Sequence, residues 1–525
     1  MSKKYWPHIL ITWSLLLALS FLLAWLSNQF MGIAGWLSFH WVLVLSSGLF
    51  IGAYWLLRSE APPAWLAYLI IAAAVLRLAF GGIWLFALPD WGYADNPVQQ
   101  AGYIMEDAYN RDAIAWRLGQ SDQPLWLAFD DFSSTDQYGG LLFISALIYR
   151  NFGSAAHQPL LIIVVAATFS ALAVLFTWAF ARRAWSAHVA ALAAWGLAFY
   201  PEAVLLGSSQ MREAFTVTLV AAALYGLTRV YAEQSHQNYL WLALPTLLVF
   251  PISLPNGAML VALLLLAYLA LENWSIFGGR LRWVALLGGA GVTLVGLLLI
   301  YEFNLLNAAQ TQAYVSEHAS GWVYRSLVLL PEWAHFPFLI TYGVFRPLLP
   351  SALVASGLPL WKALGIARAL GWTLVLVLLF YASFLSLRGA GRRGLAGALL
   401  LLTWGTILVA SFRGGGDLWD SPRYRVSFAG IQLALVAWAW HQRQESADPW
   451  LRRGFGATAA MVFWFVIWYL RRYVGLDWGL VEIQDVVGLG LATTALYWIW
   501  DWVTIQDPRA TPGGSDPLPS TRVDA

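Results

Sequence analysis

The sequence predicts an all-α protein that crosses a membrane many times, and two features of the chain carry this prediction. Hydrophobic residues make up 60% of the 525 residues and charged residues only 11%, whereas soluble domains are about a quarter charged. Apolar runs close to the roughly 20 residues that span a bilayer recur until about residue 502. An ordinary water-soluble enzyme is therefore excluded.

Each expected span is an apolar run bounded by polar residues or turn formers. The runs lie at 8–27, 36–57, 62–88, 159–180, 187–206, 214–232, 239–253, 256–271, 283–302, 371–388, 395–411, 425–441, 455–470 and 481–502. The first run follows Met-Ser-Lys-Lys without a cleavage site and is expected to be an anchor rather than a signal peptide. These runs predict about fourteen transmembrane helices.

The polar segments divide the chain into five parts. They are two extra N-terminal helices (1–61), a transmembrane module (62–302) with an outer acidic loop at 89–138, a second outer segment (303–370), C-terminal helices (371–505) and a disordered tail (506–525). The apolar stretch 139–150 is too short to cross a core of about 30 Å. We expect it to form an interfacial helix in the first outer loop.

The distribution of arginines predicts the orientation in the cell membrane. Most basic residues of the short loops, such as Arg182, Arg183 and Arg229, fall on the side of Lys3 and Lys4 if the spans alternate. Cytoplasmic loops carry an excess of Lys and Arg. Both termini are therefore expected in the cytoplasm, with the two long polar segments outside, although the Arg471-Arg472 pair opposes this assignment.

Several kinds of chemistry are missing from the sequence. The chain has no cysteine, no Gly-x-x-x-x-Gly-Lys-[Ser/Thr] loop and no His-Glu-x-x-His motif, so thiolate chemistry, P-loop ATP hydrolysis and a zinc site are not expected. No metal ligands are assigned. No cofactor is required, but paired carboxylates leave open a divalent cation, Mg²⁺ or Mn²⁺, held through oxygens. No nucleic-acid partner is expected.

The first outer segment carries the main acidic candidates. Asp107 and Asp112 lie in a run from Glu106 that is compatible with a helix, and Tyr109 lies between them. A five-residue step on a helix rotates by about 140°, so the two carboxylates do not share a face. One carboxylate is then free to face a site while the other pairs with Arg111 or caps the structure. A solvated acidic loop is the alternative.

Two further outer segments add candidates. Arg212 and Glu213 stand in a short loop before a span, where Glu213 also suits the start of a helix and Ser209 is a candidate cap. Later, Arg423-Tyr424-Arg425 leads directly into a span. In extended form, this phrase directs both guanidiniums to one side, which suits a phosphate or diphosphate. Arg346 is expected to join them, and snorkelling toward lipid headgroups is the alternative.

In order along the chain, these motifs resemble the GT-C glycosyltransferases that use lipid-phosphate donors, especially protein O-mannosyltransferases and aminoarabinose transferases. The matching phrases are Glu106 to Gly119, Tyr138-Gly139-Gly140 to Phe152-Gly153, Ala181-Arg182-Arg183, Tyr200-Pro201 to Arg212-Glu213, and Pro422-Arg423-Tyr424-Arg425. The resemblance covers roughly 62–302 and the late arginine phrase. It departs from the family by two extra N-terminal spans and by the absence of a tidy Asp-Glu pair.

The resemblance implies that Asp107 is the acidic-loop base, that Glu213 is the second acidic position and that the late arginines meet a lipid phosphate. The implied reaction transfers a sugar from a polyprenyl-phosphate, in contact with membrane lipids, to a hydroxyl of a glycan, lipid or protein on the outer face. Asp112 is a further catalytic candidate. Expected substrate contacts are Tyr109, Tyr138, Arg212, Arg346, Arg423, Tyr424 and Arg425. Asp107, Glu213 and Arg423 should then lie close together.

Two other functions remain open from the sequence. A transporter or flippase would place ionisable residues on broken helices near the membrane midplane, and Arg77 and the Pro251–Pro255 break fit that pattern. An O-antigen ligase or polymerase would share the outer loops and arginines.

Overall fold

The chain folds into a bundle of helices, and the described residues contain no strand. The computed structural model describes residues 6–27, 33–130, 138–270, 321–388, 395–413, 420–446, 448–476 and 482–504. The all-α prediction is therefore confirmed. The expected span at 283–302, the tail at 506–525 and the loop residues 131–137 lie outside the described residues.

The N-terminal part supplies two apolar helices, the acidic segment 89–138 and the central helix of the bundle. Its elements are α1 (Trp6–Leu26), α2 (Ile33–Leu56), η2 (Arg58–Glu60), α3 (Ala64–Trp91), α4 (Pro97–Gln100), α5 (Glu106–Gln120), η3 (Leu125–Phe129), α6 (Gly140–Phe152) and α7 (Pro159–Ala184). The expected helices at 106–119 and 139–150 are thus present as α5 and α6, which pack against each other.

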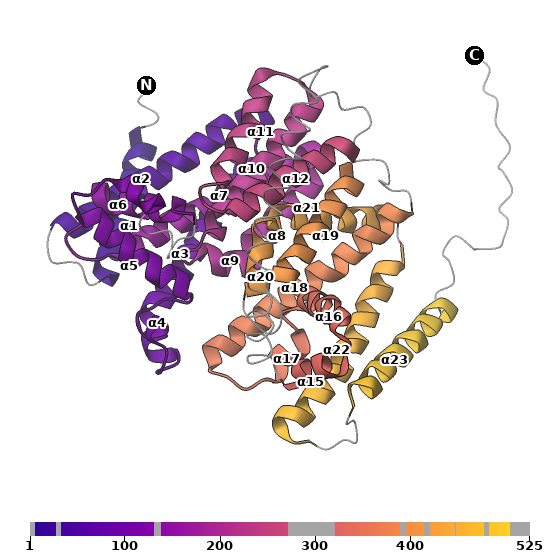
Figure 1. Cartoon of the computed structure of the whole chain (residues 1–525). Helices are drawn as coiled ribbons and strands as arrows, with labels where there is room; N and C mark the ends of the chain where they lie inside the picture. Colours follow the sequence, from indigo (N-terminus) through magenta and orange to yellow (C-terminus); the bar gives the residue numbers. More distant parts are fainter. Residues whose placement is uncertain are drawn as a thin grey trace, which may run out of the picture.

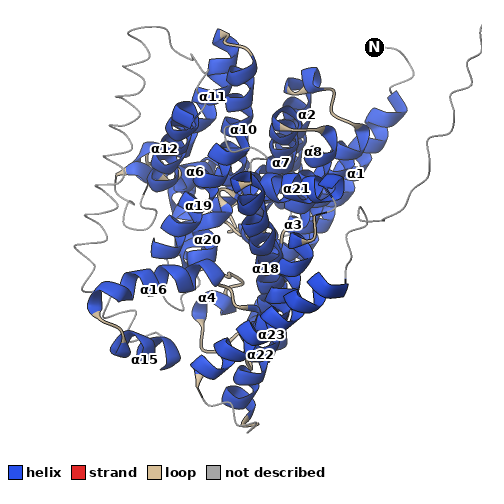
Figure 2. Cartoon of the chain, turned by 90° about the vertical axis from the view of Figure 1, so that its right-hand side faces the viewer, coloured by secondary structure: helices blue, strands red, loops and turns tan. Residues whose placement is uncertain are grey.

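The middle and C-terminal parts complete the bundle (Figure 1). Their elements are α8 (Ala187–Phe199), α9 (Pro201–Gly207), α10 (Glu213–Ala232), α11 (His236–Val249), α12 (Leu254–Ala270), α15 (Gly321–Leu329), α16 (Glu332–Phe345), α17 (Leu349–Val354), α18 (Pro359–Leu387), α19 (Leu395–Arg413), α20 (Asp420–Val426), α21 (Ala429–Ser446), α22 (Trp450–Val474) and α23 (Ile483–Thr504). In Figure 2, α4, α15 and α16 lie in the lower half of the molecule, whereas the α10–α11 turn lies at its upper end.

Most expected spans within the described residues correspond to one helix, but 187–206 corresponds to a bent pair of helices and 425–441 begins in α20 and continues in α21. Seven described helices are long and apolar enough to cross a membrane, or eight if the bent pair counts as one span. The count of fourteen stays a prediction. One boundary differs clearly, because α18 begins at Pro359 and includes residues 359–370, which the sequence assigns to the second outer segment.

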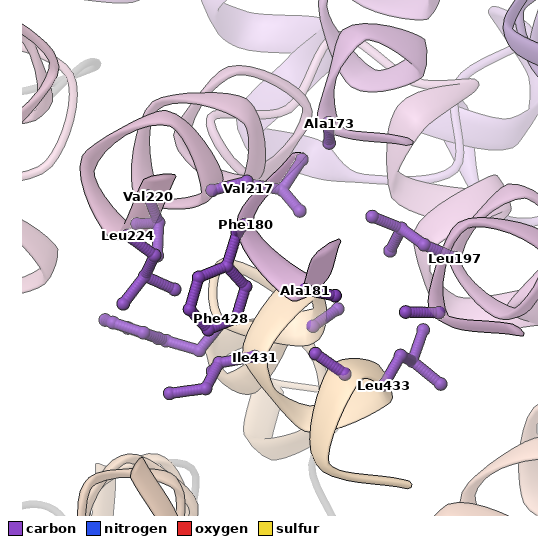
Figure 3. Close-up of a cluster of buried hydrophobic side chains, with 14 of the residues drawn as sticks. Ala173, Phe180, Ala181, Leu197, Val217, Val220, Leu224, Phe428, Ile431 and Leu433 are labelled. Carbon is purple, nitrogen blue, oxygen red and sulfur yellow. The ribbon is translucent and has the colours of Figure 1, made fainter. Parts of the chain in front are cut away.

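The core of the bundle surrounds α7, which packs against α3, α8 and α10. This helix is apolar on all sides, and 94% of its most hydrophobic window is buried, as expected for a helix at the centre of a bundle. Figure 3 shows Phe180 of α7 gathered with Leu224 of α10 and with Phe428 and Ile431 of the α21 region. Segments more than 200 residues apart in the sequence therefore form one core.

A broken span brings polar groups into this core. Helices α8 and α9 meet at a 55° bend, where Pro201 begins α9 and cannot supply a backbone N–H. The guanidinium of Arg77 on α3 donates to the carbonyls of Leu197 (3.2 Å) and Ala198 (3.1 Å), which the bend leaves without helical partners. Arg77 therefore has a structural role at the break.

Candidate active site

Helix α5 positions Asp107 at the edge of the bundle. Asp107 lies in the first turn of the helix, where a carboxylate is favoured by the helix dipole. Its Oδ2 lies 3.0 Å from Nη2 of Arg423 and 4.0 Å from Nη2 of Arg212. The side chain is 43% exposed, whereas both arginines are largely buried. Asp107 is therefore anchored by cations from the bundle and still open to a substrate.

Arg423 joins the two acidic candidates. It comes from α20, and its Nε lies 3.3 Å from Oε1 of Glu213 while its Nη2 contacts Asp107. Glu213 begins α10 and is 4% exposed. Its Oε2 is buried, with no hydrogen-bond partner among the described residues. The sequence-based expectation that Asp107, Glu213 and Arg423 lie close together agrees with this geometry.

Cations set the charge state of Asp107. Partial burial opposes ionisation, but the charges of Arg423, Arg111 and Arg212 outweigh it, so the pKa of Asp107 lies below its usual value. Asp107 is consequently a carboxylate at neutral pH. It accepts hydrogen bonds in this form, and its charge is shared with Arg423 and Arg212.

Arg425 provides a second positive charge. We call Arg423 and Arg425 the two cationic points. Its guanidinium carbon lies 3.4 Å from the centre of the Trp372 ring, and Nη2 donates to the carbonyl of Arg346 at 2.6 Å. The side chain is 1% exposed, and its Nε and Nη1 have no hydrogen-bond partner within the described parts of the chain. The Tyr200 side chain lies beside this guanidinium and interacts with it. Arg425 is thus a buried cation whose neighbours are Trp372, Tyr200 and the Arg346 carbonyl.

The two late arginines reach different partners because their segment is helical. An extended Arg-Tyr-Arg phrase, as expected from the sequence, is wrong, since α20 runs from Asp420 to Val426. Two residues on a helix differ by about 200° in direction. Arg423 therefore faces Asp107 and Glu213, while Arg425 faces Trp372. Pro422 in the first turn is the sequence signal for this helix, since proline suits the start of a helix.

An ion pair that the sequence reasoning did not predict lies next to Arg425. Arg368 of α18 donates through Nε and Nη2 to both carboxylate oxygens of Glu202 on α9, at 2.7 and 2.5 Å. Both side chains are buried. The signal was present, because Glu202 and Arg368 are charged residues within otherwise apolar helices, and such charges are usually paired. The pair joins the broken span to α18.

Among the expected substrate contacts, Tyr138, Tyr109 and Tyr424 are the aromatic ones. The Arg212 guanidinium lies 5.1 Å from the ring centre of Tyr138, and Arg423 lies 5.2 Å from that of Tyr424. Tyr109 lines a small surface pocket together with Asp107. Arg346 contributes its carbonyl to Arg425. The expected contacts therefore gather around the two cationic points.

Asp112 lies apart from this cluster. Its Oδ1 accepts a hydrogen bond from the Tyr149 hydroxyl (2.6 Å), and its Oδ2 accepts one from Tyr103 (2.5 Å) and lies 2.9 Å from Nε2 of His157. Burial and the Asp112 charge raise the pKa of both tyrosines, so they remain donors. This buried network ties α5 to α6. Asp107 and Asp112 thus face different partners, as their helical spacing predicts.

The ligands for a divalent cation are incomplete in the described part of the protein. No group of three or more His, Asp or Glu side chains comes together there in a geometry suited to a metal. Arg423 lies between Asp107 and Glu213 and contacts both carboxylates, so a guanidinium occupies the place between them. The described residues as arranged do not fit a cation.

Comparison with known proteins gives a distant structural likeness. No family model and no curated protein match the sequence. The chain is similar to solved structures of an oligosaccharyltransferase from Archaeoglobus fulgidus. One, AglB in complex with an inhibitory peptide and a dolichol-phosphate, has a TM-score of 0.40 and 14% identity over 83% of this chain. Another, tethered to an acceptor peptide, has a TM-score of 0.38 and 15% identity over 86%.

This chain covers 55% and 58% of those two longer chains.

Proposed function

We propose that the protein is a membrane glycosyltransferase that moves a sugar from a polyprenyl-phosphate donor to a hydroxyl acceptor. The observation that carries this proposal is the cluster of Asp107, Arg423 and Glu213, with Arg425 on the opposite side of the same short helix α20. A part-exposed, ionised carboxylate can take a proton from an acceptor hydroxyl. A buried guanidinium is suited to hold a phosphate.

The roles follow from the contacts of each side chain. The acceptor oxygen attacks the anomeric carbon of the sugar, and Asp107 takes the proton that the acceptor hydroxyl loses. The bond from the anomeric carbon to the phosphate oxygen breaks, and its electron pair leaves with the lipid phosphate. Arg425 stabilises the negative charge of this leaving group. Glu213 holds Arg423, which in turn orients Asp107. Attack opposite the departing phosphate inverts the anomeric carbon.

An apolar cavity beside the arginines supports a lipid-linked donor. It has a volume of about 760 Å³ and lies between α16, α18, α22 and α23. Phe345, next to Arg346 in the chain, lines it, and the ring of Tyr342, whose centre lies 5.8 Å from the Arg346 guanidinium, belongs to the same wall. A polyprenyl chain in this cavity brings its phosphate to the arginines, so each half of the donor meets a matching surface.

The side of the membrane follows from the two ends of α10. Glu213 begins this helix, and Arg229 lies in its last turn, roughly 24 Å away at 1.5 Å per residue. Arg182 and Arg183 lie at the same end as Arg229, since Arg183 and Tyr225 both bind Glu60. Basic residues favour the cytoplasmic side. The proposed active site therefore faces outward.

The direct test is cleavage of the donor by purified protein in nanodiscs. Polyprenyl-phosphate mannose and polyprenyl-phosphate glucose serve as donors, and release of polyprenyl phosphate is measured. We expect Asp107→Asn to lower turnover by about a hundredfold or more, since general-base catalysis contributes roughly 10²–10⁴. Asp122→Asn, at an exposed position just after α5, is the matched control. Equal turnover in the wild type and Asp107→Asn would remove Asp107 from the mechanism.

A further inference from the structure

A second large cavity lies beside the proposed active site and has no role in donor binding. It has a volume of about 900 Å³, between the loop around α4 on one side and α17–α18 on the other. Its polar and aromatic lining includes Tyr93, Asp95, Gln99 and Glu106 from the first wall and Trp361 and Lys362 from the second. The size is typical of a small-ligand site, which usually measures about 300–1,000 Å³.

Hydrogen bonds fix the shape of this cavity. The Gln99 side chain is buried, and its Oε1 accepts hydrogen bonds from the backbone N–H of Tyr93 (2.8 Å) and from Nε1 of Trp361 (3.2 Å). The Gln99 amide oxygen therefore connects the two walls of the cavity. The Asn96 side chain caps α4 through the N–H groups of Val98 and Gln99. The cavity is a built feature rather than a gap between loosely placed loops.

The cavity is continuous with the catalytic machinery along two helices. Glu106 lines it, and Asp107 is the next residue of α5. On α18, Trp361, Arg368 and Trp372 are spaced by seven and four residues, which places them on one face of the helix. That face runs from the cavity to Arg425, over roughly 16 Å at 1.5 Å per residue. Glu106 lines both this cavity and the surface pocket that Asp107 lines, so it separates the two spaces.

The lining matches the chemistry of a sugar. The carboxylates of Asp95 and Glu106 accept hydrogen bonds, and the ammonium of Lys362 donates them, which suits hydroxyl groups that do both. Tyr93 and Trp361 add rings with a flat apolar surface and a polar edge. Two acids and one base disfavour a polyanionic ligand. We propose that this cavity binds the acceptor and that the acceptor is a neutral oligosaccharide, an inference that rests on the proposed glycosyltransferase function.

The test measures sugar binding without any lipid donor. Neutral tetrasaccharides of glucose, mannose and N-acetylglucosamine are titrated onto protein in nanodiscs, and binding is followed by saturation-transfer NMR. We expect saturable binding of at least one of them. Trp361→Ala and the double variant Asp95→Asn/Glu106→Gln should each weaken it by about tenfold, since lost hydrogen bonds of about 1–1.5 kcal/mol correspond to that factor.

Two further variants separate lost contacts from lost folding. Trp361→Phe keeps the aromatic face and should retain most of the binding, and Trp126→Ala, whose side chain is 65% exposed outside the cavity, should leave binding unchanged. No saturable binding by any of the three sugars, or equal binding by Trp361→Ala, would overturn the proposal. Saturable binding of a Ser/Thr-rich peptide without binding of any sugar would overturn the proposal in favour of a protein acceptor. Because no donor is present, these outcomes are independent of the donor-cleavage test.

Discussion

Arg423 and Arg425 are two residues apart and use their guanidiniums in different ways. Arg423 contacts two carboxylates through different nitrogens, whereas Arg425 lies over the Trp372 ring and donates to the Arg346 carbonyl. Lysine keeps the charge but has a single nitrogen and no planar fork. At these two positions, the shape of the cation therefore matters as much as its charge.

Lysine substitutions test this difference. Arg423→Lys and Arg425→Lys should lower donor affinity or turnover nearly as much as alanine does, by about ten- to a hundredfold for a contact of roughly 1.5–3 kcal/mol. The measurement is the donor-cleavage rate as a function of donor concentration. Arg325→Lys, at an exposed position on α15, is the control. Wild-type rates in both lysine variants would mean that these arginines only neutralise charge.

The pH profile reports on the cations around Asp107. Because its pKa is held below the usual value of about 3.9, Asp107 stays ionised well below neutral pH, and activity that depends on it is lost only in acid. Arg212→Gln removes one of the charges that favour the carboxylate, so the acid limb of kcat/KM should move to higher pH. The profile of Arg325→Gln should match that of the wild type. An unchanged acid limb in Arg212→Gln would contradict this account.

At the scale of single elements, the ion pair between Glu202 and Arg368 links helix α9 to helix α18. Glu202 and Arg368 are buried and share two hydrogen bonds. Breaking such a pair leaves one unpaired buried charge, at about 3–5 kcal/mol, whereas replacing both partners by apolar residues is often neutral. Arg368→Met should therefore lower the thermal stability strongly, and Glu202→Leu/Arg368→Met should recover most of it.

The stability of these variants is measured by thermal unfolding in nanodiscs, with tryptophan fluorescence as the readout. Arg117→Met, on the exposed side of α5, is the control for loss of a single arginine. If the double variant is no more thermally stable than Arg368→Met, Glu202 and Arg368 contribute to stability independently and not as an ion pair.

Helix boundaries illustrate what the sequence can predict about elements. Hydropathy located the membrane helices because apolar side chains must cover each span. It put the start of a span at residue 371 because Lys362 and Arg368 lower the local hydropathy, whereas the helix itself starts at Pro359. The helical form of α20 was also missed, although Pro422 marks its first turn. Where polar residues lie near the end of a helix, hydropathy therefore misplaces that end.

At the scale of the whole molecule, the orientation of the bundle is open to a direct chemical test. Since the chain has no cysteine, single cysteines can be introduced and treated in intact cells with a membrane-impermeant maleimide. Asp122→Cys lies in the segment after α5, which is expected on the same side of the membrane as the proposed active site, and should be labelled. Glu233→Cys lies after α10, at the end predicted to be cytoplasmic, and should be labelled only after lysis. The reverse pattern would invert the orientation and put the active site inside.

The long-range assembly of the site was only partly predictable. The order of the motifs indicated Asp107, Glu213 and Arg423 as partners, but hydropathy contains no information on which helices are neighbours. The network of Arg425, Trp372 and Arg346 depends on the packing of α18 and α20 beside α9. The same holds for the cavity between α4 and α18. Pairwise contacts across hundreds of residues need the folded structure.

Arg77 sets a condition on the order in which the chain enters the membrane. An arginine at the centre of a spanning helix opposes insertion by about 2.5–3.5 kcal/mol. Its partners include Ser170 and the carbonyl of Ala198, which follows it by 121 residues. At about 5–20 residues per second, the ribosome needs roughly 6–24 s to make that stretch. During this interval the Arg77 guanidinium on α3 lacks the hydrogen-bond acceptors of its final site, so we expect the insertion machinery to retain α3 until α8 arrives.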